Sequence, residues 1–137
     1  MILVDTNVWS ELTKPEGDPA VLAWLEANDA KLALSTLVMS EIQYGLELPR
    51  AAHKRADLFL WLRGLEERYW SNVWAFDAED ARSFGRLAAS VEVKKRDPQV
   101  IDLQLAAQAL ARGAAIATRN VKGFDWTGVS VIDPWTA

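Results

Sequence analysis

Short apolar runs along the chain alternate with longer segments in which apolar residues recur at helical spacing. The runs are continuous rather than interrupted by polar residues, which is typical of strands that are covered on both faces. We predict five such strands, at Ile2–Asp5, Leu32–Ser35, Val73–Phe76, Ala115–Thr118 and Ser130–Ile132. Helical spacing predicts five helices between them, at Pro19–Asn28, Leu37–Leu48, a segment with Leu58, Leu62, Leu65 and Tyr69 on its apolar face, Asp77–Val93 and Val100–Arg112.

This alternation of strands and helices predicts an α/β fold with a mainly parallel central sheet. The local signals agree, because Asp18 and Thr36 are suitable N-caps and Gly113 is a suitable residue to end the last helix. The 137 residues contain no repeat, low-complexity tract or linker, so we expect one domain over residues 1–137. Ligands of such sheets bind where the parallel strands end, so the residues after each strand are the candidates for chemistry.

Composition narrows the chemistry that the chain can perform. The absence of cysteine excludes disulfides, thiol nucleophiles, iron–sulfur clusters and cysteine zinc sites. His53 is the one histidine, so a histidine-rich zinc site is excluded and a Ser-His-Asp triad has a single candidate base. The 19 acidic and 15 basic residues give a net charge of −4, which argues against coating nucleic acid by bulk charge but allows a local basic patch.

The sequence contains no recognisable targeting signal. Met1 is followed directly by an apolar strand candidate, without the basic n-region of a signal peptide. No apolar run approaches the length of a membrane span, so we expect a cytoplasmic protein with no membrane association.

Three acidic residues occupy positions where surface charge is not expected. Asp5 ends the first predicted strand, at the edge where ligands bind. Glu41 lies within the apolar stripe of its predicted helix, where an unpaired carboxylate costs several kcal/mol. Asp102 lies in the first turn of the last predicted helix, on the same face as Ala106 and Ala109.

Each of these acids also has a purely structural interpretation. Asp5 is a good helix cap, Glu41 fits an internal salt bridge, and a first-turn acid such as Asp102 is stabilised by the helix dipole. Thr118, Asn120 and Asp125 form a fourth polar group after the fourth strand, and loop chemistry alone also accounts for them.

Taken together, these side chains favour a metal site. Carboxylates brought close to one another repel, and their pKa values rise unless a cation neutralises them. Hard oxygen ligands select Mg²⁺ or Mn²⁺ rather than zinc, and such an ion lowers the pKa of an attacking water in phosphate chemistry. A bound metal would therefore supply the nucleophile that this histidine-poor composition otherwise lacks.

Four motifs in order along the chain resemble those of the PIN-domain ribonucleases, and most closely the VapC toxins of toxin–antitoxin pairs in their FitB-like branch. The motifs are Met1-Ile-Leu-Val-Asp-Thr-Asn, Ser40-Glu-Ile-Gln-Tyr-Gly, Ile101-Asp102 and Ala117-Thr-Arg-Asn. The closing Val131-Ile-Asp-Pro-Trp is also similar to that branch, so the resemblance covers essentially the whole chain.

The resemblance implies a PIN-like three-layer α/β/α sandwich with about five strands, and a Mg²⁺- or Mn²⁺-dependent endoribonuclease. It implies that Asp5, Glu41 and Asp102 are the catalytic acids and the metal ligands, with Thr6, Asn7, Thr118 and Asn120 lining the site. It also implies that the chain forms a homodimer. A small VapB-like antitoxin would cover the acidic pocket and form a larger assembly with the toxin.

One position departs from the family pattern. Members often carry an acid where Gly123 stands here, so the fourth acid is either shifted to Asp125 or absent. This departure leaves the number of metal ions open.

Basic and aromatic residues near the expected site are candidates for RNA contacts. The candidate phosphate-binding residues are Lys94, Lys95, Arg96, Arg119 and Lys122, although a charged turn equally explains the first three. Trp9 and Trp126 are candidates to border the site and stack on bases.

Two alternative functions remain at this point. A receiver-like phosphoacceptor domain would need paired acids after the first strand and a lysine after the last, and neither is present. A PIN-like module that has lost its chemistry and acts by binding protein or nucleic acid is consistent with the departure at Gly123.

Overall fold

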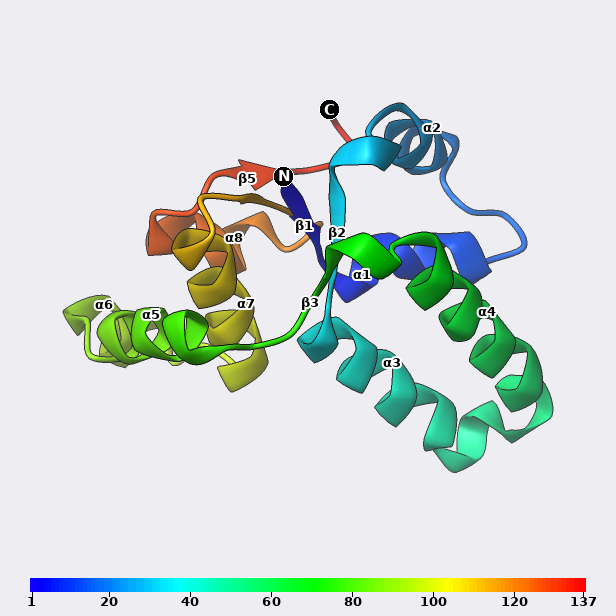
Figure 1. The fold of residues 1–137 in the computed structure, drawn as a ribbon, viewed down its shortest axis with the longest axis horizontal. Helices are drawn as coiled ribbons and strands as arrows, with labels where there is room; N and C mark the ends of the chain where they lie inside the picture. Colours follow the sequence, from blue (N-terminus) through cyan, green and yellow to red (C-terminus); the bar gives the residue numbers. More distant parts are fainter.

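The computed structural model describes residues 1–137, apart from the side chain of Val91, and its centre is one five-stranded sheet (Figure 1). All four strand pairings are parallel, and the strand order is β3-β2-β1-β4-β5. The strands are β1 (Ile2–Val4), β2 (Leu32–Ser35), β3 (Val73–Trp74), β4 (Ala115–Ala117) and β5 (Val131–Ile132). The parallel α/β architecture predicted from the apolar runs is therefore confirmed.

The central strand β1 is paired on both sides and is fully enclosed. Leu3 pairs with Ala33 of β2 and with Ile116 of β4, and all three residues are completely buried. Strands covered on both faces need apolar side chains at every position, which explains why these runs do not alternate with polar residues. The order reverses at β1, because β2 leaves it on one side and β4 on the other, and ligands bind at such a switch point.

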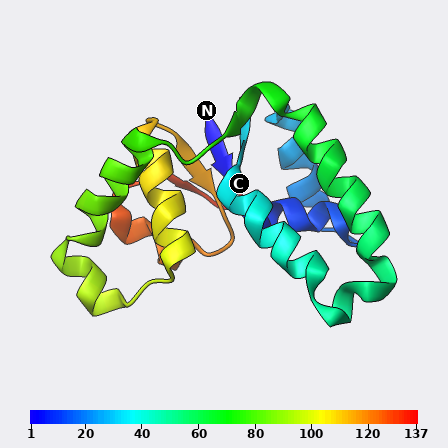
Figure 2. The same ribbon diagram turned by 60° about the horizontal axis from the view of Figure 1, so that its bottom comes forward.

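Helices cover both faces of the sheet, as Figures 1 and 2 show. On one face lie α1 (Thr6–Trp9), α2 (Pro19–Ala27), α3 (Thr36–Glu47) and α4 (Arg55–Arg68). On the other lie α5 (Ala78–Ala88), α6 (Val91–Arg96), α7 (Val100–Ala111) and α8 (Val121–Phe124). Crossovers between parallel strands are right-handed, so the reversal of strand order at β1 sends the second set of helices to the opposite face. None of the described helices combines the length and the apolar character that crossing a bilayer requires.

Two details of the helices differ from the sequence predictions. The helix predicted at Asp77–Val93 is interrupted, because Ser90 adopts an extended conformation and a second helix, α6, begins after it. The predicted N-cap Thr36 is instead the first residue of α3, and the Ser35 hydroxyl accepts a hydrogen bond from the backbone N–H of Leu37 at 3.1 Å. Asp18 caps α2 as predicted, accepting from the backbone N–H of Ala20 at 2.8 Å.

One of the two tryptophans predicted to border the site, Trp9, lies in the core instead. Trp9 is completely buried and packs on Tyr69 with ring centroids 5.1 Å apart. A completely buried ring offers no face to RNA, so the prediction for Trp9 is wrong.

Candidate active site

Asp5 lies directly after β1 and is held by three hydrogen bonds. Its carboxylate accepts from the Thr6 backbone N–H at 2.8 Å, the Thr118 hydroxyl at 2.8 Å and the Asn7 amide at 3.2 Å. Burial raises the pKa of Asp5 above its ordinary value, although the hydrogen bonds from Thr118, Thr6 and Asn7 oppose that rise. The capping interpretation is thus correct for the backbone contact, but most of this network reaches beyond the helix end.

The other predicted site-lining residues belong to the same network. Asn7 donates to the Thr118 hydroxyl at 3.3 Å, and its side-chain oxygen accepts from the backbone N–H of Arg119 at 3.2 Å. The backbone N–H of Asn120 donates to Thr118 at 3.0 Å. The ends of β1 and β4 are therefore joined by side chains as well as by the sheet.

Glu41 lies on α3 and, like Asp5, accepts a hydrogen bond from Thr6. The Thr6 hydroxyl donates to Glu41 Oε1 at 2.8 Å, and the Glu41 side chain is half-buried. Burial raises the pKa of Glu41, the hydrogen bond from Thr6 lowers it, and the negative charges of Asp5 and Asp102 raise it further. The carboxylate predicted within an apolar stripe thus faces two other acids.

Asp102 completes this group from the first turn of α7. Burial and the charge of Asp5 raise the pKa of Asp102 to about 6. None of the ion pairs formed among the described residues includes Asp5, Glu41 or Asp102. The internal salt bridge considered for Glu41 is therefore absent from that part of the structure, and the negative charge of the three acids has no basic partner there.

The donor set suits a hard divalent cation, but it is not a closed cage. In the part of the chain that the structure describes, no three acidic or histidine side chains lie close enough together to enclose an ion. Mg²⁺ keeps several of its waters and is usually held by one or two carboxylates, so it does not need such a cage. Burial is the main cause of the raised pKa values of Glu41 and Asp102, and repulsion by the neighbouring acids adds to it; a cation would relieve that repulsion.

A cleft of about 660 Å³ opens beside Asp102. Three predicted phosphate-binding residues line it, Lys95 and Arg96 from α6 and Lys122 from α8, together with Asn120 and Trp126. The charged turn expected at Lys94 to Arg96 is helical, and Lys94 does not line the cleft. The guanidinium of Arg119 instead lies 4.8 Å from the ring centroid of Trp135.

The side chain of Asn120 lies close to the glycine at position 123. A Cβ atom placed on Gly123 would collide with the side-chain amide of Asn120. An acid at this position would require Asn120 to move. Asp125 is exposed and is not among the residues that line the cleft.

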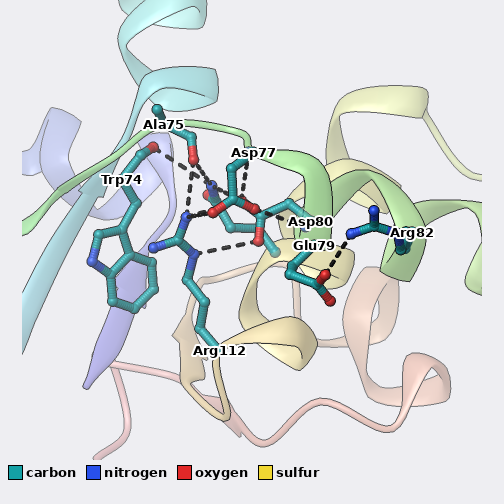
Figure 3. Close-up of polar contacts among 8 residues, drawn as sticks. Trp74, Ala75, Asp77, Glu79, Asp80, Arg82 and Arg112 are labelled. Atoms are coloured by element: carbon teal, nitrogen blue, oxygen red, sulfur yellow. Dashed lines mark hydrogen bonds and ion pairs between the residues drawn. The ribbon is translucent and has the colours of Figure 1, made fainter.

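A second polar cluster, shown in Figure 3, was not predicted. Arg112 at the end of α7 donates to both oxygens of Asp80, at 3.0 and 3.3 Å, and to the backbone oxygen of Ala75 at 2.9 Å. Gln108 also donates to Asp80, at 3.0 Å. Asp77 and Asp80 form a capping box at the start of α5, and this spacing of acids was the available sequence signal.

Glu11 is another buried acid that sequence reasoning missed. It is 4% exposed, pairs with Lys14 at 2.6 Å and accepts from the backbone N–H of Asp18 at 2.9 Å. These contacts close the loop between α1 and α2, so the role of Glu11 is structural.

Comparison with known proteins gives consistent matches along the chain. Residues 2–126 match the family model described as the PIN domain. A VapC ribonuclease of Sinorhizobium fredii is 36% identical over 137 residues, covering 98% of both chains. The toxin FitB of Neisseria gonorrhoeae is 27% identical, covering 98% of this chain and 99% of that protein. The crystal structure of FitAcB from Neisseria gonorrhoeae has a TM-score of 0.90 at 27% identity, over the full length of both chains.

Proposed function

This chain belongs to the PIN-domain family, within its VapC ribonucleases, and from that premise we propose that it is the toxin of a toxin–antitoxin pair and cleaves RNA in a metal-dependent reaction. The observation that carries the proposal is the convergence of Asp5, Glu41 and Asp102 at the switch point of the sheet. A cation is the partner that such a group of acids requires.

Asp5, Glu41 and Asp102 would hold Mg²⁺ or Mn²⁺, with water molecules completing its coordination. The ion would polarise the phosphodiester and lower the pKa of the attacking water. The proposed site contains no histidine that could activate the water instead. Thr118 and Asn7 keep the Asp5 carboxylate in one orientation, and Thr6 does the same for Glu41. Asp102, which also lines the cleft, would be the acid that accepts a proton from the water.

The substitution Asp5→Asn tests this proposal. We expect loss of Mg²⁺-dependent RNA cleavage, because an amide keeps the size of the side chain but removes its negative charge. The matched control is Asp57→Asn, an exposed acid in the first turn of α4, which should cleave RNA as the original protein does. Full activity of Asp5→Asn in a correctly folded protein would refute the proposed site and would favour a binding role for this PIN domain.

The proposal includes a VapB-like antitoxin, a homodimer and a cytoplasmic location. Support for protein partners comes from α3 and α4, where the large apolar side chains of Tyr44, Phe59 and Leu60 are exposed. The mass of the purified chain in solution is the measurement, and a monomer at all concentrations would refute the dimer.

A further inference from the structure

We infer that the cleft beside Asp102 binds an unpaired nucleobase of the RNA, stacked on the indole of Trp126 and adjacent to the phosphate that is cleaved. The inference deepens the proposed function and rests on it. The cleft contains the two components that single-stranded nucleic acid requires, an aromatic surface and cations that follow the backbone. Trp126 supplies the first, and Lys95, Arg96 and Lys122 supply the second.

The indole of Trp126 is fixed in place at the cleft wall. Its Nε1–H donates to the backbone oxygen of Gly123 at 3.0 Å, and the side chain is only partly buried. The guanidinium of Arg96 lies 5.7 Å from the centre of this ring. A nucleobase that stacks on this face takes the place of the Arg96 guanidinium, which is then free to contact a phosphate group.

The cations of the cleft are available to phosphate groups. Lys95 and Arg96 share one acid, Glu92, at 3.7 and 3.6 Å, and the side chain of Lys95 is 73% exposed while those of Arg96 and Glu92 are 46% and 41% exposed. Exposed ion pairs of this kind contribute about 0–1 kcal/mol, so phosphate oxygens can replace Glu92 at little cost. Lys122 takes part in none of the ion pairs found among the described residues.

The position of the cleft relates the base to the reaction. Asp102 lines the cleft and also belongs to the group of three acids, so a base on Trp126 belongs to a nucleotide next to the scissile phosphate. In a duplex the bases are paired and stacked on each other, and their faces are not available to a side chain. The expected substrate is therefore a single-stranded segment or loop, in which stacking on Trp126 accepts any base.

The test measures binding apart from cleavage. Fluorescence anisotropy in EDTA would follow a short labelled single-stranded RNA, and a series of the same RNA with one base removed at each position in turn. We expect one position at which base removal weakens binding to the original protein about tenfold, the scale of one lost stacked base. Trp126→Ala should show that loss with the intact RNA and no further loss at that position, whereas Trp126→Phe should retain the original pattern.

Controls separate this inference from other outcomes. Trp70→Ala removes a tryptophan that is 77% exposed and does not line the cleft, and it should bind as the original protein does. If Trp126→Ala does not fold, Trp126→Leu replaces it, because leucine keeps apolar bulk at this position. Trp126→Leu should likewise show no extra loss of affinity when the base at the sensitive position is removed. The inference would be overturned if Trp126→Ala and Trp126→Leu bound the intact RNA as tightly as the wild-type protein. It would also be overturned if these variants and the wild-type protein lost the same affinity at every abasic position. RNA cleavage by Asp5→Asn would overturn the proposed function instead and would leave this binding result intact.

Discussion

Thr6 contacts two of the three site acids at once. Its backbone N–H donates to Asp5 and its hydroxyl donates to Glu41, both at 2.8 Å. The two carboxylates raise each other's energy, so the residue between them fixes how far apart they are held. Thr6 is therefore a positioning residue, and its role is separable from the charge of the acids.

Thr6→Val removes this hydroxyl while keeping the shape of the side chain. We expect kcat for RNA cleavage to fall about tenfold with little change in KM, because Glu41 loses its orientation but the RNA contacts remain. Thr6→Ser, which keeps the hydroxyl, should recover most of the rate. Thr136→Val changes an exposed threonine near the C-terminus and should leave kcat unchanged, and an equal loss in that control would contradict the assignment.

Asp102 makes stability depend on pH in a defined direction. Its pKa in the folded protein is about 6, whereas an unfolded chain has about 3.9. The folded state binds more protons in this window, so the contribution of Asp102 to stability is complete below about pH 4 and is lost as pH rises through about 6.

Asp102→Asn should consequently raise Tm at pH 7 in metal-free buffer. The expected rise is about 3 °C, for about 1 kcal/mol after allowing for solvent screening of a partly exposed group. Added Mg²⁺ should raise Tm of the original protein and have less effect on the variant. The control Asp57→Asn shares the first-turn position in its helix, and a similar rise there would attribute the effect to the helix and not to the site.

Among the elements, α5 and α7 are joined by the cluster around Arg112. Asp80 is 1% exposed, and burial disfavours its charged form, but hydrogen bonds from Arg112, the Asp77 backbone and Gln108 outweigh burial and lower its pKa. The guanidinium of Arg112 also lies 4.8 Å from the centre of the Trp74 ring. This contact secures the C-terminal end of the helix whose first turn carries Asp102.

Arg112→Met should lower the free energy of unfolding by about 3 kcal/mol, because it leaves the Asp80 charge buried without its cationic partner. The control is Arg82→Met, since Arg82 pairs with Glu79 on the exposed side of α5 and should contribute less than about 1 kcal/mol (Figure 3). Adding Asp80→Asn to Arg112→Met should restore part of the loss. Denaturant unfolding measures each value, and equal effects of the two arginine substitutions would contradict this explanation.

The features that could be predicted from the sequence were those that depend on neighbouring residues alone. Continuous apolar runs located β1, β2 and β4, and Glu41 and Asp102 were recognisable because charge is costly on an inward face. The interruption at Ser90 and the burial of Trp9 were not recognisable, because both depend on how distant elements pack. The partners of Asp80 come from a helix about thirty residues away, which no local pattern reveals.

On the scale of the whole molecule, the acidic and basic residues near the site have different roles: the acids would hold the metal ion, and the basic residues would contact RNA. The chain has a net charge of −4, yet Lys95, Arg96 and Lys122 line one cleft beside the acids. We expect RNA to approach this cleft despite the overall negative charge. Salt screens repulsion from acidic residues more than about 10 Å away, whereas the contacts between phosphates and the basic residues of the cleft are short.

Affinity for single-stranded RNA should therefore fall as salt concentration rises. The slope of log Kd against log salt should decrease by about 0.7 for each phosphate contact that is removed. Lys95→Gln and Lys122→Gln should each reduce the slope by that amount, and Lys31→Gln, which alters an exposed lysine outside the cleft, should not. Unchanged slopes in the two cleft variants would show that these lysines do not contact RNA.

The pairing of β1 with β4 has a consequence for protein synthesis. Asp5 accepts a hydrogen bond from Thr118, which is 113 positions further along the chain, and its own backbone N–H donates to Ala117. On the ribosome, Asp5 is therefore made long before the residues that orient it, and contacts between such distant segments form late. An unfinished nascent chain lacks an ordered site, so a cell that makes this protein meets an active nuclease only after translation has passed β4.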